Sequence, residues 1–227
     1  MSSVASVGSR ARVARVWQAP IGKKAVMALT GVVLFGFVLG HMLGNLQIYL
    51  GSEQIDHYAV LLRSSPKLLW AVRGVLLVAL VLHFVSAAQL KSISRAARPD
   101  DYRKYDPQRS TLGARTMLGS GLLLLAFVVY HLMHFTFGNA HPDFEELKVH
   151  HNVVTGFQEW PVSVSYIVAM VFLGMHLRHG LWSMFQSLGV SHPRYTPALR
   201  TFATVFAVVI VIGNVSIPIA VLAGLIG

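Results

Sequence analysis

The chain has 227 residues, of which 54% are hydrophobic and only 12% are charged, about half the charged share of a typical soluble domain. This composition excludes an ordinary soluble globular protein. The chain has no cysteine, so it can form neither a disulfide nor the usual ligand set of an iron–sulfur cluster. Its formal net charge of +10 does not indicate nucleic-acid binding, because the basic residues gather beside apolar segments, where membrane topology and anionic lipid account for them.

Five apolar segments are each long enough to cross a bilayer as a helix, which takes roughly 20 residues. They cover about residues 25–49, 69–91, 113–137, 162–188 and 200–225. We therefore predict an all-α membrane protein with one transmembrane domain over residues 1–227, in which the first four spanning helices form an antiparallel bundle. We find no internal repeat in the sequence.

The distribution of charge predicts the orientation of these helices. The N-terminal arm, residues 1–24, carries basic residues and no acid; they are Arg10, Arg12, Arg15, Lys23 and Lys24. Because lysine and arginine are enriched on the cytoplasmic side of membranes, the arm is expected inside. The basic segment 92–111 and the turn around Arg194 and Arg200 then lie on the same side, and the acidic segment 139–160 and the C-terminus lie outside.

Histidines recur inside the predicted spans: His41, His83, His131, His134, His176 and His179. A rise of about 1.5 Å per residue places His41 and His131 at one level near the outer face. The same count, taken from the outer ends of the second and fourth spans, places His83 and His176 together nearer the cytoplasm, on the order of 10 Å away. A single buried histidine can be a hydrogen-bonded interior residue, but ionisable groups at this depth are costly and usually functional.

Two histidine pairs on alternate helices describe two stacked haem b groups, each with its iron between two imidazoles. We predict that His41 and His131 bind the outer haem and that His83 and His176 bind the inner one. With both axial positions filled there is no open place for oxygen or substrate, so such haems transfer electrons. His134 and His179 remain alternatives, because residues three apart share a helix face.

Other residues fit this prediction but also have ordinary explanations. Gly36, Gly40 and Gly44 give room for a porphyrin beside His41, or serve close helix packing. Arg73 and Arg178 have no carboxylate within the predicted spans, so they either bind haem propionates or reach towards the interface. A haem-free scaffold, or a metal or proton pathway, is the alternative from another class, although metal pathways usually include carboxylates or thiolates.

Four stretches resemble the cytochrome b membrane anchor of succinate dehydrogenase and fumarate reductase, in its single-chain, five-helix, two-haem form. They are "GKKAVMALTG" leading to "GHMLGNL", "LHF", "YHLMHF" and "HLRHGLWSMFQSLG". The resemblance implies a bacterial cytoplasmic membrane protein that binds a flavoprotein and an iron–sulfur subunit and passes electrons from succinate to a quinone, most simply menaquinone. It also implies the same four haem ligands, and the distance from His176 to Gly189 favours His176 over His179.

The resemblance leaves several features open. Some family members carry a glutamate two residues before the fourth ligand, where this chain has Gly174, which favours succinate oxidation over fumarate reduction. Polar residues near the outer haem that could serve a quinone are Asp56, His57, Tyr58, His141 and Glu145, and no catalytic residue is assigned among them. The complexes could form trimers. A two-haem cytochrome b of a hydrogenase or formate dehydrogenase is the closest alternative function.

Overall fold

The computed structural model describes residues 19–97 and 112–227, and these residues are helical with short connections. The five long helices are α2 (Pro20–Asn45), extended by the 3-10 turn η1 (Leu46–Leu50), α4 (Pro66–Ala96), α5 (Leu112–Phe135), α7 (Trp160–Ser187) and α8 (Thr196–Leu222). All five are long and apolar enough to cross a membrane, which confirms the predicted fold class. Residues 1–18 of the predicted basic arm and 98–111 of the predicted basic loop lie outside the described residues.

Proline sets the start of four of the long helices. Pro20, Pro66, Pro161 and Pro197 occupy the first turn of α2, α4, α7 and α8 respectively. Proline is suited to this place because the first turn has no intrahelical partner for a backbone N–H and because its fixed φ already matches the helix. The prolines therefore place the helix starts three to five residues before the hydrophobic runs predicted for α2, α4 and α8.

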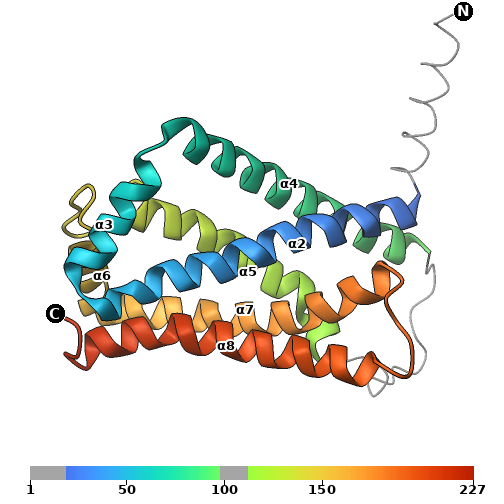
Figure 1. Cartoon of the computed structure of the whole chain (residues 1–227). Coiled ribbons are helices and arrows are strands. Elements are labelled where there is room, and N and C mark those ends of the chain that lie inside the picture. Colours follow the sequence, from blue (N-terminus) through green and yellow to red (C-terminus); the bar gives the residue numbers. More distant parts are fainter. Residues whose placement is uncertain (1–18, 98–111) are drawn as a thin grey trace, which may run out of the picture.

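The long helices alternate in direction and form an antiparallel bundle (Figure 1). We call the end that carries α3 (Ser52–Arg63) and α6 (Val149–Gln158) the outer end, and the opposite end the inner end. Helix α2 packs on α4, α5 packs on α7, and α7 packs on α8. Figure 1 shows α4 diverging from α2 towards the outer end, so these two helices are closest near the inner end.

Helix α8 is an integral part of the bundle although it carries no histidine. Ile210 and Ala203 are almost completely buried, at 0% and 1% exposure. Helix α8 packs on both α2 and α7, where a methyl group added at Gly213 would meet Met42 and one added at Gly174 would overlap Val211. The glycines thus allow α8 to approach both neighbours closely, as small residues do between membrane helices.

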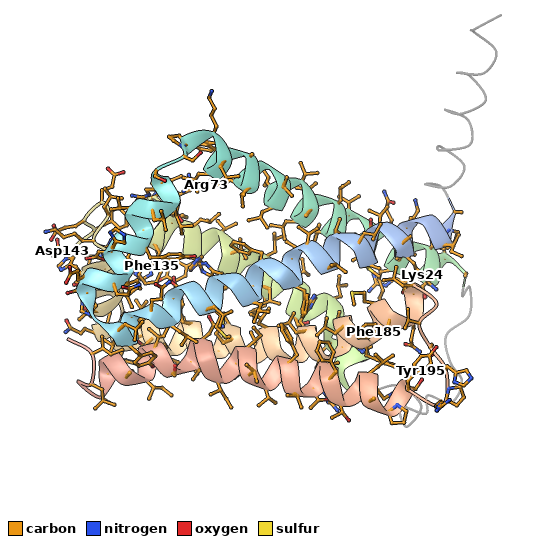
Figure 2. The ribbon with its side chains drawn as sticks, in the orientation of Figure 1. Lys24, Arg73, Phe135, Asp143, Phe185 and Tyr195 are labelled. Atoms are coloured by element: carbon orange, nitrogen blue, oxygen red, sulfur yellow. The ribbon has the colours of Figure 1, made fainter. Side chains whose placement is uncertain are left out.

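Two short helices that we had predicted as connecting segments cover the outer end. Helices α3 and α6 contribute Ile55, Val153 and Phe157 to a buried cluster that also contains Tyr166 of α7. The Asp56 carboxylate accepts a hydrogen bond from the backbone N–H of His150 at 2.9 Å, which satisfies a free donor in the first turn of α6. Every described acidic residue lies at this end; Figure 2 shows Asp143 there and Lys24 at the inner end.

Candidate haem-binding site

The outer histidine pair joins α2 and α5. The ring centres of His41 and His131 are 5.7 Å apart, and the rings are nearly perpendicular at 87°. Each ring is held by a phenylalanine one helical turn earlier: Phe37 stacks on His41 at 5.3 Å and Phe127 on His131 at 5.9 Å. The two side chains that were predicted to share a level therefore lie against each other.

The inner histidine pair joins α4 and α7. The ring centres of His83 and His176 are 6.4 Å apart. His83 lies against Thr30 of α2, which precedes His41 by eleven residues, so the two pairs are about 16 Å apart along the helices. This spacing is of the same order as the separation of about 10 Å predicted from the sequence.

Hydrogen bonds fix the tautomer of His83. Its Nδ1 lies 3.1 Å from the carbonyl oxygen of Met27, and a carbonyl can only accept. The Thr30 hydroxyl, 3.3 Å from the same nitrogen, donates its own hydrogen to the carbonyl of Val26 at 2.7 Å. Nδ1 of His83 must therefore carry the proton, which leaves a lone pair on Nε2.

His176 is held in the same way by α5. Its Nδ1 lies 3.3 Å from the hydroxyl of Ser120, which donates its hydrogen to the carbonyl of Met117 at 3.1 Å. The Nδ1–H of His176 therefore donates to Ser120, and Nε2 again bears the lone pair. Metal-binding histidines characteristically donate their second ring N–H to a protein acceptor in this manner.

The ring separations fit a metal ion between two imidazoles. A metal bound to two histidine nitrogens at about 2 Å each separates the ring centres by roughly 6 Å, close to the observed 5.7 and 6.4 Å. Within the described residues no three histidine or acidic side chains are grouped as a metal site would require. Bare zinc or copper usually needs three or four protein ligands. Two histidines suit a haem iron better, because the porphyrin supplies its remaining ligands.

The bundle also has open space beside these residues. An apolar groove of about 420 Å³ runs along α4 from Trp70 to Leu82 and reaches Thr30 of α2. A methyl group added at Gly36 or Gly40 would meet no atom within 4 Å. Gly44 differs, because Tyr58 of α3 packs directly against it. The glycine stripe therefore borders open space at two positions and serves close packing at the third.

The structure separates His134 and His179 from the two pairs. His134 is completely buried among Tyr130, Tyr166 and His141 and does not face His41. His179 is partly exposed and makes no ring contact or hydrogen bond with another described residue. It is thus His131 and His176, one turn earlier in each helix, that meet the histidines of α2 and α4.

The two arginines lie against other groups. The Nε of Arg178 donates to the hydroxyl of Thr204 on α8 at 3.1 Å. Residues two apart point to opposite sides of a helix, so Arg178 faces α8 rather than the inner pair. Arg73 lies over the ring of Trp70, with 5.1 Å from its guanidinium carbon to the ring centre, near the outer end of α4 (Figure 2).

Most of the polar residues considered for a quinone have structural roles. Asp56 accepts a hydrogen bond from the first turn of α6, and Tyr58 packs against Gly44. One ring nitrogen of His141 accepts a hydrogen bond from the backbone N–H of Asp143, and the other donates to the carbonyl of Asn152. The hydrogen bond from Lys148 holds the pKa of the Glu145 carboxyl below its usual range, so this group is a weak base. Only His57 is exposed at the surface with no hydrogen-bond partner among the described residues.

The residues that hold the histidines were not found from the sequence, and together they reveal an internal repeat. A hydroxyl residue, a glycine and a phenylalanine stand before each outer histidine. Ahead of His41 they are Thr30, Gly31 and Phe37, and ahead of His131 they are Ser120, Gly121 and Phe127. All four correspondences have the same spacing of 90 residues. The sequence prediction that the chain has no repeat was therefore wrong; hydroxyl groups eleven residues before an intramembrane histidine were the signal.

Comparison with known families places the chain in a membrane-subunit family. A model of the family described as succinate dehydrogenase/fumarate reductase transmembrane subunit matches residues 94–214, more than half of the chain. The matched region includes α5, α7 and therefore His131 and His176. No curated protein and no solved structure matches the chain.

Proposed function

The chain belongs to the succinate dehydrogenase/fumarate reductase transmembrane subunit family, and from this premise we propose that it is a two-haem cytochrome b anchor. Family membership makes it a multi-pass membrane subunit of an oxidoreductase complex. The proposal adds that the chain holds two haem b groups and passes electrons between an iron–sulfur subunit and a quinone.

The observation that carries the proposal is the paired orientation of the histidines. His83 and His176 are both protonated on Nδ1 by their contacts with Met27 and Ser120. Each ring then keeps a free lone pair on Nε2, and the ring centres lie 6.4 Å apart, a spacing that suits a cation bound between them. The described residues supply no third ligand, which argues against a bare metal pathway.

The four histidines would each have one role, which is to supply a nitrogen that holds a haem iron. His83 and His176 would hold the inner haem, and His41 and His131 the outer haem. A haem with two protein axial ligands supplies reversible one-electron transfer and no open coordination position. The hydroxyls of Thr30 and Ser120 help to keep the inner imidazoles in the ligating tautomer.

The proposed partners follow from the family and from the charge distribution. A flavoprotein and an iron–sulfur subunit would bind the basic inner end, and electrons would reach a quinone, taken as menaquinone, near the outer haem. Gly174 packs directly against Val211, so the glutamate of some relatives has no room at this position. This observation supports succinate oxidation without a glutamate-dependent proton path.

One experiment separates this proposal from its alternatives. The complex is purified through this chain, and its reduced-minus-oxidised optical spectrum is recorded before and after addition of succinate. We expect two b-type haems, at least one of them reducible by succinate, and covalently attached flavin in a large partner. Haem without succinate reduction, and with a hydrogenase or formate dehydrogenase as the partner, would indicate the alternative complex. Absence of haem would contradict the proposal.

A further inference from the structure

Tyr166 of α7 lies between two histidines of α5. Its hydroxyl is 3.0 Å from Nδ1 of His134 and 3.4 Å from Nδ1 of His131. The ring is only 6% exposed and is enclosed by Phe127, Phe135 and Phe157 at centre distances of 4.9, 5.6 and 5.0 Å. Because the aromatic rings fix the phenol, its hydroxyl stays within reach of both imidazoles.

A single hydroxyl proton cannot serve both nitrogens as a donor. At least one imidazole must therefore donate its Nδ1–H to the phenol oxygen, and the phenol hydrogen can be donated to the other imidazole. If His131 directs the Nε2 lone pair towards His41, as the proposed function requires, its Nδ1 carries the proton and donates to Tyr166. The Tyr166 hydrogen is then directed to Nδ1 of His134.

We propose that Tyr166 is a positioning residue for His131, acting in a directed hydrogen-bond chain from His131 through Tyr166 to His134. This inference rests on the proposed function. A phenol that donates its own hydrogen is a stronger acceptor, so this hydrogen-bond chain increases the electron density on His131. The outer haem therefore has a lower reduction potential than it would have if His131 had no hydrogen-bond acceptor.

The surroundings of His134 agree with a role at the end of this chain. The residue is completely buried, and its Nε2 has no hydrogen-bond partner among the described residues. Gly156 of α6 leaves the space that the ring occupies, since a methyl group there would lie 2.9 Å from Cε1 of His134. A buried polar atom without a partner is costly, and the contact with Tyr166 is the polar interaction this ring makes.

His41, the other histidine of the outer pair, has no equivalent hydrogen-bond chain among the described residues. Arg73 precedes His83 by ten residues, as Tyr166 precedes His176, so Arg73 occupies the corresponding place in the other half of the repeat. Its guanidinium lies over Trp70, and a guanidinium can only donate. Among the described residues Nδ1 of His41 therefore has no hydrogen-bond acceptor like Tyr166, and the hydrogen-bond chain serves His131 alone.

The test is a potentiometric titration of both haems in the purified complex, followed optically. Tyr166→Phe keeps the aromatic ring and removes the hydroxyl. We expect the outer haem potential to become more positive by about 59 mV, a tenfold change for one electron, with the inner potential unchanged. Tyr130→Phe is the matched control, because Tyr130 stacks on His134 but its hydroxyl makes no hydrogen bond to another described residue.

A second variant keeps the inference falsifiable if Tyr166→Phe does not assemble. His134→Leu removes the terminal acceptor and should shift the outer potential in the same direction, and the double variant should add nothing to Tyr166→Phe. An unchanged outer potential in a variant that retains both haems, or an equal shift in Tyr130→Phe, overturns the inference. A wild-type complex without haem refutes the proposed function instead, so the two failures are distinguishable.

Discussion

At the scale of single residues, the site depends on which ring nitrogen of each histidine carries its proton. Neutral imidazole has one donor and one acceptor, and only the acceptor can bind a metal. The Nδ1 atoms of the inner pair form hydrogen bonds with Met27, Thr30 and Ser120, which leaves both Nε2 atoms as acceptors. Side chains that would not touch a haem thus decide whether the ligands are correctly presented.

Replacement of the paired histidines is expected to remove the haems selectively. His83→Ala or His176→Ala should remove the inner haem and leave the outer one, and His41→Ala should do the reverse. His179→Ala should retain both haems, because His179 contacts neither pair. Haem content per chain, together with the optical spectrum, provides the measurement. Retention of both haems in His83→Ala would contradict the assignment of ligands.

The two hydroxyl residues should differ in importance. Ser120 is the hydrogen-bond partner of His176, whereas His83 keeps the Met27 carbonyl when Thr30 is replaced. Ser120→Ala is therefore expected to lower inner haem occupancy or shift its potential more than Thr30→Val does. Ser120→Thr should restore the wild-type behaviour. The control is Ser165→Ala, because Ser165 is exposed and bonds only to the carbonyl of Val162. If Ser120→Ala, Thr30→Val and Ser165→Ala changed the inner haem equally, the hydroxyls would have no role in orienting the inner histidines.

At the scale of helices, two copies of one arrangement build the bundle. In each half a first helix (α2 or α5) supplies a hydroxyl, a glycine, a phenylalanine and an outer histidine, and the next long helix (α4 or α7) supplies an inner histidine. Because antiparallel neighbours reverse direction, the hydroxyl of the first helix meets the histidine of the second. Repetition of this pair yields two levels of two histidines.

The interface between α7 and α8 can be tested through Gly174. A methyl group at this position overlaps Val211, a stiff β-branched side chain, so Gly174→Ala should destabilise the protein by about 1–3 kcal/mol. Thermal unfolding in detergent measures the effect. The double variant Gly174→Ala/Val211→Ala should recover much of the loss, since the second change removes the overlap. If Gly174→Ala unfolds like the wild type, this close contact does not matter for stability.

At the scale of the whole molecule, the described acidic residues gather at one end. Every described acidic residue lies at the outer end, and the α7–α8 turn and the start of α2 carry basic residues at the inner end. Since lysine and arginine mark the cytoplasmic side, the inner end should face the cytoplasm and receive the catalytic subunits. The alternating helices place the start of α2 and the end of α8 on opposite sides (Figure 1).

The absence of cysteine makes this orientation directly measurable. Gln158→Cys at the outer end and His192→Cys at the inner end each introduce one exposed thiol. A membrane-impermeant thiol reagent should label Gln158→Cys in intact cells and His192→Cys only after the membrane is opened. The unmodified chain is the control. The reverse pattern would show that the orientation is inverted.

The sequence alone determined the number of membrane-spanning helices and the histidine pairs, because bilayer thickness fixes helix length and the helical rise fixes height. Only the tertiary structure showed that His131 lies against His41 while His134 is enclosed by α6 and α7, since both residues share one helix face. It also assigned Arg178 to α8 and identified Thr30, Ser120 and Tyr166 as the partners of the histidines. These roles depend on the rotation and crossing of neighbouring helices, which packing sets and which hydrophobicity and spacing do not encode.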